Sequence, residues 1–487
     1  MNNEIRPIGS FFAIGVTLII WFVIPTPKTV TPEAWHLLAL FVGTITAIIA
    51  KAMPIGAIAM LAITLVALTG VTSPDPKIAI KDALSGFSSP LIWLIGIAII
   101  ISRGLLKTGL GNRIGYYFIS HFGKNTIGIA YSLALSELVI APVTPSNTAR
   151  GGGIIHPIMK SIAESFDSSP QKGTESKIGK YLALASYHIN PITSAMFITA
   201  TAPNPLIVKF IAQSTGADIS ITWTQWALAA FLPGIIAIAL VPIVVAKFYP
   251  PEILHTPDAP EFAKEKLSHM GKMSMDEKIM IGVFGLLLFL WAGVPEMIFG
   301  SSFSLNATSV ALLGLSILLA TSVLTWEDVL NEKSAWDTIT WFAALVMMAG
   351  FLNELGLIDW LSKLVETNIS SMGIGWEIST LILVLVYFYA HYLFASTTAH
   401  ITAMFAAFFI AGIALGAPPY FLALLLAGAS SLMMSLTHYA TGTSPIVYGS
   451  GYVTLIEWWK MGFILSVVNL SIWIVVGGVW WRVLGLW

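Results

Sequence analysis

The chain has 487 residues, of which 56% are hydrophobic and only 10% are charged, and its formal net charge is -1 at pH 7. Soluble domains carry roughly a quarter charged residues, so this composition excludes an ordinary soluble protein and predicts an integral membrane protein. The sequence contains no cysteine, which excludes disulfides, thiolate metal sites and a cysteine nucleophile.

Apolar runs that could cross much or all of the roughly 30 Å hydrocarbon core of a bilayer recur along the chain. These runs are continuous, whereas a membrane β-barrel shows segments of about ten residues with alternating polarity. We therefore predict an all-α polytopic membrane protein. The uninterrupted spans cover about 9–26, 33–51, 53–71, 89–106, 223–246, 279–299, 303–325, 338–352 and 462–481.

The first span lies within residues 1–30 and is predicted to be a retained transmembrane helix. One basic residue, Arg6, precedes the apolar run, which ends at Pro25 and Pro27 without a cleavage site of small residues. This pattern is not that of a secretory signal peptide. Because no targeting segment is recognised, we expect the protein in a bacterial plasma (inner) membrane, in contact with lipid.

The apolar segments of the first half are interrupted twice. Short apolar pieces flank the polar stretch TPSNT, which indicates a re-entrant hairpin over about 125–163 with Ser146, Asn147 and Thr148 at its tip. The segment of about 181–213 contains TAPNP, which indicates a broken helix. Backbone that is not helical at membrane depth must face protein, water or a ligand, because its N–H and C=O groups are otherwise unpaired.

A polar segment divides the chain. Residues 248–278 carry mixed charges and several prolines, which is typical of a solvated linker. The density of basic residues also changes there, because 20 of the 24 lysines and arginines lie at or before Lys278. We therefore predict a first repeat over 31–247 and a second repeat over 279–487.

Two polar motifs recur once in each half and in the same order. The motif TPSNTAR (144–150) matches FASTTAH (394–400) at an offset of 250 residues. The motif ATAPNPLIV (200–208) matches ATGTSPIVY (440–448) at an offset of 240 residues. The shared order of the two matches argues for a duplication.

A weaker match supports the same duplication, because LLKTGLG and LNELGLI align Gly109 with Gly356. The second half is therefore predicted to contain a hairpin over about 375–415 and a broken helix over about 419–456. Short or interrupted hydrophobic segments at matching places in two halves are the sequence features that best indicate the binding site of a secondary transporter.

The interrupted segments predict a site for an anion. A helix that restarts after a break presents free N–H groups and the positive end of its dipole, worth about half a charge, and hydroxyl and amide groups add donors. The second tip consists of Ser396, Thr397 and Thr398, so each tip could hold one carboxylate of a small dianion. Arg150 and His400 occupy the same position of the repeat, where each is or can become cationic.

The paired tips, with TPSNTARGGG in full, resemble the divalent anion:sodium symporter family, and more closely its branch of plastid-type 2-oxoglutarate/malate translocators and their bacterial relatives. The resemblance implies about 11 transmembrane helices, arranged as an initial helix and two inverted repeats of five spans. It also implies a homodimer and an elevator-type movement of a transport domain. The substrates that it implies are 2-oxoglutarate, malate, succinate and fumarate.

The same resemblance implies roles for particular residues. Asn147 and Thr148 would donate to substrate from the first half, and the residues of the second tip from the second half. The broken helices would close the site through Thr201, Pro203, Thr443 and Pro445.

The second tip departs from the family pattern. The symporters carry Ser-Asn-Thr in both halves, whereas here Thr397 replaces the second asparagine. Fixed cations beside the tips would also repel sodium. Our hypothesis is that Arg150 and His400 take the place of sodium and make the protein a sodium-independent dicarboxylate exchanger. The alternative is a sodium-coupled dicarboxylate symporter.

Other titratable residues in apolar segments have open roles. Glu137 is predicted to pair with a basic group such as Arg150, because an unpaired carboxylate there is costly, and a proton carrier is the alternative. For His188, His391 and His438 we favour hydrogen-bonded structural roles, and the alternative for His188 and His438 is a position directly behind the substrate-binding residues.

Other classes of protein fit the sequence less well. It has no GxxxxGK[ST], HExxH or GxSxG motif, which argues against ATP coupling and an intramembrane hydrolase. An anion channel needs a continuous polar lining, whereas the polar residues cluster at the interruptions. We therefore predict a transporter and not an enzyme, with small dicarboxylates as ligands and without a cofactor, a metal site or a nucleic-acid partner.

Overall fold

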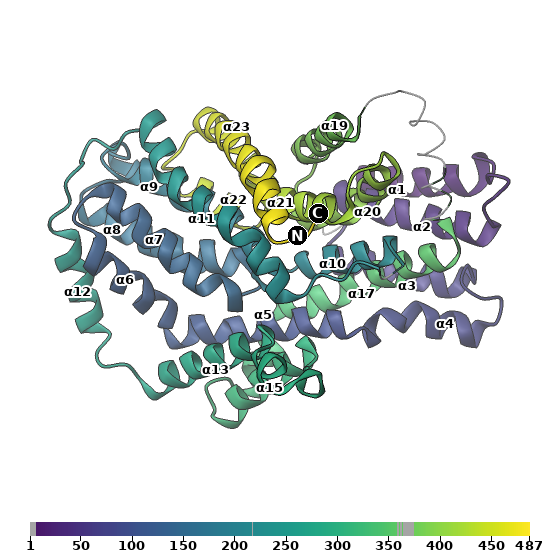
Figure 1. Cartoon of the computed structure of the whole chain (residues 1–487), viewed down its shortest axis with the longest axis horizontal. Coiled ribbons are helices and arrows are strands. Elements are labelled where there is room, and N and C mark those ends of the chain that lie inside the picture. Colours follow the sequence, from purple (N-terminus) through teal and green to yellow (C-terminus); the bar gives the residue numbers. More distant parts are fainter. Residues whose placement is uncertain (1–5, 217, 358–359, 361–362, 364–374) are drawn as a thin grey trace.

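The computed structural model describes residues 6–216, 218–357, 360, 363 and 375–487 (Figure 1). Across these residues the chain forms helices, and an isolated bridge between Asn125 and His255 is the only sheet-like pairing among them. The predicted all-α fold is confirmed. Two predicted segments lie partly outside the described residues. For the predicted first helix, 1–30, this part is 1–5, and for the predicted second repeat, 279–487, it is 358–359, 361–362 and 364–374.

Eight helices in the described part of the chain are long and apolar enough to cross a membrane. They are Pro32–Ile49, Pro90–Thr108, Thr126–Val143, Trp223–Phe248, Lys333–Glu354, Trp376–Leu393, Thr397–Ala414 and Leu455–Val483. Four shorter apolar helices accompany them, namely Pro7–Val23, Ile55–Thr69, Ala307–Ala320 and Pro419–Ser435. The chain is an integral membrane protein with eight full-length candidate spans in its described part, where the resemblance implied about 11 in all.

The first helices start where their sequences favour a start. Pro32, Pro76 and Pro90 each occupy the first helical position, where a missing N–H costs no hydrogen bond. The elements of this part are α1 (Pro7–Leu18), η1 (Ile19–Val23), α2 (Pro32–Ile49), α3 (Ile55–Thr69), α4 (Pro76–Leu84), η2 (Ser85–Ser88), α5 (Pro90–Thr108) and α6 (Leu110–Phe122).

The first interrupted hairpin and the first interrupted helix follow. The polar stretch at 144–147 separates α7 from η4, and the residues after Met196 separate α9 from α10. The elements are α7 (Thr126–Ile140), η3 (Ala141–Val143), η4 (Thr148–Ile155), α8 (His156–Ser165), η5 (Pro170–Lys172), α9 (Gly179–Met196), η6 (Ile198–Ala200), α10 (Asn204–Ser214) and α11 (Trp223–Phe248).

The predicted polar linker, 248–278, contains a helix that the sequence reading did not predict. This helix, α12 (Ala259–His269), packs on α6 at one end of the molecule (Figure 1). Arg113 of α6 forms an ion pair with Glu277, with 2.6 Å between Nε and Oε1, and donates to the carbonyl of Gly271. The linker is therefore attached to the first half and is not free chain.

The elements that follow α12 are α13 (Met275–Trp291), α14 (Val294–Phe299), η7 (Ser301–Phe303), α15 (Ala307–Ala320), α16 (Trp326–Asn331) and α17 (Lys333–Glu354). The second interrupted hairpin and helix lie among α19 (Trp376–Tyr389), η9 (Ala390–Leu393), α20 (Thr397–Ala414), α21 (Pro419–Leu432), η10 (Met433–Ser435), α22 (Thr443–Gly449), α23 (Leu455–Ile472), η11 (Trp473–Gly477) and α24 (Gly478–Val483).

The two glycines of the weak repeat match share an unusual backbone conformation. Gly109, which ends α5, has a φ of 76°, and Gly356, which follows α17, has a φ of 78°. Residues with a side chain rarely adopt this left-handed conformation, so glycine suits both positions.

The interrupted elements of the two halves pack together. Helix α21 contacts α9, α20 contacts α10, and α22 contacts η4. In Figure 1, α6 to α9 lie toward one end of the molecule, α1 to α4 toward the other, and α5 and α17 between them. Helix α17 packs against α2, α3, α4 and α5. The interrupted elements therefore border a separate group of continuous helices, namely α2, α3, α4, α5 and α17.

Candidate functional site

Both hairpins and both broken helices contribute to one cavity of about 230 Å³. We call residues 146–148 tip 1, residues 396–398 tip 2, residues 197–203 break 1 and residues 433–442 break 2. The cavity is lined by all four segments and by α5 and α17. Its lining residues are Ile99, Pro145, Ser146, Asn147, Thr148, Thr201, Ala202, Pro203, Ser334, Thr338, Trp341, Ala395, Ser396, Thr397, Thr398, Thr441 and Gly442.

Four helices start at this cavity. Asn147 caps η4, Pro203 caps α10, Ser396 caps α20 and Gly442 caps α22, and all four residues line the cavity. The first N–H groups of a helix have no partner inside the helix, and the helix dipole is positive at this end. Helices α10 and α20 are 11 and 18 residues long, whereas α22 has only seven. The cavity is therefore surrounded by positive helix ends.

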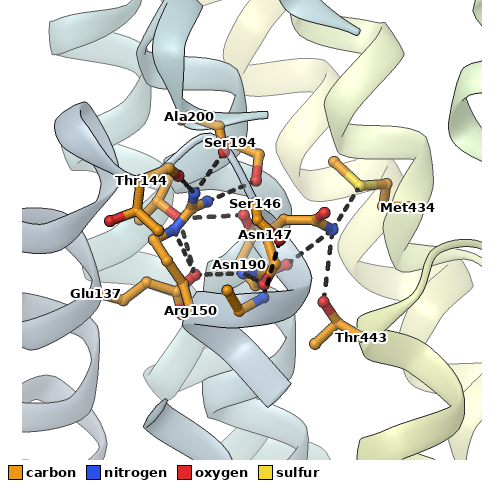
Figure 2. Close-up of polar contacts among 12 residues, drawn as sticks. Glu137, Thr144, Ser146, Asn147, Arg150, Asn190, Ser194, Ala200, Met434 and Thr443 are labelled. Carbon is orange, nitrogen blue, oxygen red and sulfur yellow. Dashed lines mark hydrogen bonds and ion pairs between the residues drawn. The ribbon is translucent and has the colours of Figure 1, made fainter. Parts of the chain in front are cut away.

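Tip 1 is joined to break 2 through one side chain. The Asn147 amide donates to the Thr441 hydroxyl at 2.8 Å. It also reaches the Thr443 hydroxyl at 3.5 Å and the Met434 sulfur at 3.4 Å (Figure 2). The carbonyl of Asn147 accepts from Nδ2 of Asn190, which belongs to α9. A residue of the first half therefore connects the interrupted elements of both halves.

Arg150 lies behind tip 1 and connects it to break 1. Its guanidinium donates to the carbonyl of Thr144 at 2.5 Å, to the carbonyl of Ala200, and to the hydroxyl of Ser194 at 2.9 Å (Figure 2). Its Nε lies 3.6 Å from Oε1 of Glu137, and neither side chain is exposed. The pairing of Glu137 with Arg150 predicted from the sequence is confirmed.

Glu137 has further donors on α9. Its Oε1 accepts from the amide of Asn190 and from the Thr193 hydroxyl at 3.1 Å, whereas its Oε2 has no partner in the described protein. Since Asn190 also donates to the backbone of tip 1, the carboxylate, the guanidinium and the amide form one buried network. This network fixes the position of tip 1 relative to α9 and break 1.

Tip 2 is held by uncharged hydrogen bonds. The Ser396 hydroxyl accepts from the backbone N–H of Ala399 at 3.3 Å and caps α20, and the Thr397 hydroxyl donates to the carbonyl of Ala440 at 3.1 Å. Nε2 of His391 also lies 3.3 Å from that carbonyl. Tip 2 and break 2 are therefore joined at Ala440.

His391 also contacts His400, with 3.1 Å between their Nδ1 atoms. The contacts define a tautomer for each ring when both rings are neutral: His391 donates from Nε2 to Ala440 and accepts at Nδ1, and His400 donates from Nδ1. Nε2 of His400 is then an acceptor, and it is buried without a partner in the described protein. The contacts of tip 2 thus require no charge.

Eight of the ten residues predicted to bind substrate line the cavity, and the other two do not. Thr443 is fully buried beneath tip 1, and Pro445 is exposed elsewhere on α22. Because α22 begins at Thr443, the helical turn carries these side chains away from the cavity. Arg150 and His400, predicted to compensate charge, are also buried outside the cavity lining.

The sequence reading missed several lining residues. Thr441 and Gly442 line the cavity where Thr443 and Pro445 were predicted, and Thr441 stands 240 positions after Thr201, so the repeat offset could have identified it. Thr338 and Trp341 of α17 also line the cavity. No motif indicates these two residues, because they lie in a continuous apolar helix.

The remaining two histidines with open roles lie away from the cavity. His188 is fully buried, with its ring 6.4 Å from the ring of Trp458, and the Nδ1 atom of His438 accepts from the Trp459 indole at 3.2 Å. The contact of His438 agrees with the hydrogen-bonded role favoured from the sequence, whereas His188 has no such bond within the described residues.

The cavity lining that the described residues form is polar but uncharged. Among the described residues, the lining offers hydroxyl, amide and indole donors and includes no charged side chain. A larger cavity, of about 760 Å³, lies among α5, α10, α11, α13 and α15, but most of its lining is apolar and no tip residue reaches it. We therefore place the candidate site in the smaller cavity, where polar groups from both halves converge.

The chain is similar over its whole length to known transporters. A protein of Bacillus subtilis named "Putative malate transporter YflS" is 50% identical, with 100% of this chain and 98% of that protein covered. The chloroplastic dicarboxylate transporter 1 of Arabidopsis thaliana is 46% identical, with 99% and 84% covered. The citrate/succinate antiporter of Escherichia coli K12 is 36% identical, with 99% and 98% covered.

A solved structure, that of the Alcanivorax borkumensis YdaH transporter, resembles the fold with a TM-score of 0.56 over 98% of this chain and 97% of that chain, at 12% identity. The family model described as the sodium:sulfate symporter transmembrane region matches residues 6–487. The chain therefore belongs to this family, the divalent anion:sodium symporters, and is an integral membrane transporter.

Proposed function

We propose that the protein is a secondary transporter of C4 and C5 dicarboxylates, among them malate, succinate, fumarate and 2-oxoglutarate. It exchanges one dicarboxylate for another across a bacterial plasma membrane without sodium. Transport proceeds by alternating access, in which the two tips and the two breaks move together as an elevator-type unit. The resemblance further implies that two copies of the chain form a homodimer.

The observation that carries the proposal is the convergence of four helix starts on one small polar cavity. A dianion there would accept hydrogen bonds from free backbone N–H groups and from hydroxyls on both tips, and the helix dipoles would favour its charge. Because tip 1 and tip 2 lie on one cavity, each can take one carboxylate. The names of the relatives, which refer to malate, dicarboxylates and citrate/succinate, support the same class of substrate.

The surroundings of Arg150 support sodium independence. A sodium site needs several oxygens that converge on the ion, and at tip 1 the oxygens of Thr144, Ala200 and Ser194 are engaged by the guanidinium instead. The guanidinium is held there by Glu137 and is always charged. The guanidinium of Arg150 therefore connects the region of tip 1 to break 1, as a bound sodium ion would otherwise do.

The same arrangement favours exchange over uniport. Without a dianion, the positive helix ends at the cavity have no counter-charge, and moving them across the hydrocarbon region of the membrane is costly. With a dianion bound, the opposite charges offset one another. The loaded unit therefore crosses more readily than the empty unit, which is the property of an obligatory exchanger.

Sodium-coupled symport is the second candidate, and one observation favours it. The hydroxyls of Ser435 and Thr437 in break 2 are fully buried and have no partner within the described residues. Neutral oxygens of this kind could coordinate a small cation beside tip 2. This cation would have to bind next to the His391 and His400 pair.

Uptake into proteoliposomes separates the two candidates. Labelled malate or 2-oxoglutarate is offered to vesicles that are empty or preloaded with unlabelled dicarboxylate, each with and without an inward sodium gradient. Exchange predicts uptake that requires preloading and is the same in sodium and in potassium. Uptake into empty vesicles that follows the sodium gradient would contradict the exchanger and establish symport. Large unitary currents in electrical recordings would contradict both, because they are typical of a channel.

A further inference from the structure

The cavity has a wall that belongs to neither hairpin nor broken helix. Thr338 and Trp341 of α17 line it together with the tips, and the two residues lie about one helical turn apart. Helix α17 packs closely against the continuous helices: a Cβ atom at Gly86 of η2 would lie 2.0 Å from the carbonyl oxygen of Ala343. The α17 wall, defined as Thr338 and Trp341, is therefore fixed to the group of continuous helices.

Both residues of the α17 wall have unused hydrogen-bond donors. Thr338 is 9% exposed and Trp341 is 6% exposed, yet neither the hydroxyl nor the indole N–H makes a hydrogen bond within the described residues. Neither atom is among the fully enclosed polar atoms without a partner. Both donors therefore remain accessible, and both residues line the cavity together with the polar residues of the tips and breaks and with Ser334 of α17.

The neighbours of this wall behave differently. Thr340 on the same helix donates to the carbonyl of Trp336 at 2.8 Å, and Ser334 donates to Oε1 of Glu332 at 2.6 Å. The Trp336 indole donates to the carbonyl of Val329. Each of these three residues of α17 therefore has a partner within the protein, although Ser334 also lines the cavity.

We propose that Thr338 and Trp341 form a second part of the binding site, which holds the dicarboxylate in only one of the two alternating states. The inference rests on the proposed function. The tips would bind the carboxylates, and the two donors of the wall would bind the substrate surface that the tips leave uncovered. When the tips and breaks move past α17, the substrate leaves this wall but keeps its contacts with the tips. The site therefore has a higher affinity at one membrane face than at the other.

The consequence is that KM for the dicarboxylate differs between the two membrane faces. The tips and breaks alone would not produce this difference, because they travel with the substrate. A hydrogen bond to a charged group contributes enough that its loss raises KM by about tenfold or more. Removal of either donor should therefore raise KM at one face and leave KM at the other face unchanged. A residue of the tips, which travels with the substrate, should change KM at both faces.

The experiment measures dicarboxylate exchange from each face separately. Because the chain has no cysteine, one cysteine introduced at the exposed Lys264 can be labelled with a membrane-impermeant maleimide to measure the orientation of the protein in proteoliposomes. KM is measured for external malate with saturating internal malate, and for internal malate with saturating external malate. The variants are Thr338→Val and Trp341→Phe, which keep shape and lose the donor. Thr340→Val is the matched control on the same helix, and Thr338→Ser restores the hydroxyl.

The expected result is a KM raised about tenfold at one face only for Thr338→Val and Trp341→Phe, with wild-type values for Thr340→Val and Thr338→Ser. An equal rise at both faces would overturn the asymmetry, and wild-type KM at both faces would overturn the binding role. If the wild type exchanges no dicarboxylate, the proposed function itself fails. In that case thermal stabilisation of detergent-solubilised protein by malate and succinate, compared between wild type and Trp341→Phe, still tests the wall, and equal stabilisation of the two would overturn it.

Discussion

The two tips line the same cavity with similar side chains, yet their supports differ in kind. Tip 1 is held by a buried ion pair, in which Arg150 joins the carbonyl of Thr144, just before the tip, to the carbonyl of Ala200 of break 1 and is balanced by Glu137. Tip 2 is held by neutral hydrogen bonds from Thr397 and His391 to Ala440 of break 2. The two alanines are equivalent positions of the repeat, 240 residues apart, so the same connection is made by charged groups in one half and by neutral groups in the other.

The residues behind the tips differ in the same way, with charged groups in the first half and neutral groups in the second. Tyr387 stands 250 positions after Glu137, and its hydroxyl lies 2.7 Å from the hydroxyl of Ser430, which stands 240 positions after Asn190. The ring of His400 packs at 4.7 Å on the ring of Tyr387, where the first half has the ion pair. At these matched positions the first half makes its contacts with charged groups and the second half with neutral ones. This difference predicts that the first half tolerates substitution less well.

The largest expected effect is at the ion pair. Arg150→Met leaves Glu137 as an uncompensated buried charge, which should lower the free energy of unfolding by about 3–5 kcal/mol. His400→Phe removes one neutral hydrogen bond and should cost about 1 kcal/mol. Thermal unfolding of the purified variants in one detergent gives the order of stability. The double variant Glu137→Gln/Arg150→Met should be more stable than Arg150→Met alone, and equal stability of the two would contradict the pairing.

The next effect concerns the close approach of break 2 to tip 1. A Cβ atom at Gly442 would lie 2.4 Å from the hydroxyl of Thr148, so Gly442→Ala should displace tip 1 at a cost of about 1–3 kcal/mol and raise KM for malate. The equivalent position in break 1, 240 residues earlier, is already Ala202. Ala202→Gly is therefore the control, and KM from exchange assays is the measurement. Wild-type KM in Gly442→Ala would show that the tip and the break do not need this contact.

A smaller effect distinguishes the donors of the two tips. The Asn147 amide has two N–H groups, and its bond to Thr441 at 2.8 Å is the only short one within the described residues, since its contacts with Asn190, Met434 and Thr443 are 3.4–3.5 Å long. It can therefore exchange a long contact for a bond to a carboxylate, whereas the single hydroxyl of Thr397 already donates to Ala440 at 3.1 Å. Asn147→Ala should therefore raise KM by about tenfold, and Thr397→Val by a few-fold at most. Thr397→Asn adds a donor and should lower KM. A larger rise for Thr397→Val than for Asn147→Ala would reverse this comparison.

The smallest effect lies at the base of the first hairpin, outside the membrane. Hydrogen bonds and charge from Lys172, then from Lys177, lower the pKa of Asp167 from its ordinary value to about 2. A lowered pKa means that the ion pairs stabilise this loop above the ordinary pKa, near pH 4, and that this stabilisation disappears as the pH falls toward 2. The base of the second hairpin is the short apolar connection 415–418.

Limited proteolysis of the loop 166–178 by an acid-active protease measures this effect. Cleavage of the wild type should increase between about pH 4 and pH 2, and Asp167→Asn should be cleaved at the higher rate throughout this range. The connection 415–418 provides the internal control, because it has no ionisable side chain. A wild-type loop whose cleavage does not change with pH would contradict a role for the ion pairs.

Much of the framework could be predicted from the sequence because it depends on local pattern. Continuous apolar runs determine membrane helices, and polar stretches such as TPSNT and TAPNP interrupt them, since hydroxyls, prolines and unpaired backbone are costly in lipid. The repeat offset then related the two tips. The helix α12 was not predicted, because the mixed charges and prolines of 248–278 are as typical of a solvated linker as of a short surface helix.

The candidate site could be predicted only in part. The tip residues are marked by their own motifs, and eight of the ten predicted binding residues line the cavity. The positions of Thr443 and Pro445 depended on where α22 begins, and a shift of one or two residues turns a helical side chain to another face.

The sequence by itself determined that the protein is a membrane-embedded all-α chain with duplicated polar interruptions, because composition and apolar run length depend only on the order of residues. The tertiary structure alone decided which groups face the cavity and which lie behind it. Arg150 and His400 occupy equivalent positions, yet Arg150 binds backbone carbonyls and Glu137, whereas His400 acts on the break through His391. Contacts between residues far apart in the chain cannot be read from either residue alone, because they depend on the packing of the helices that carry them.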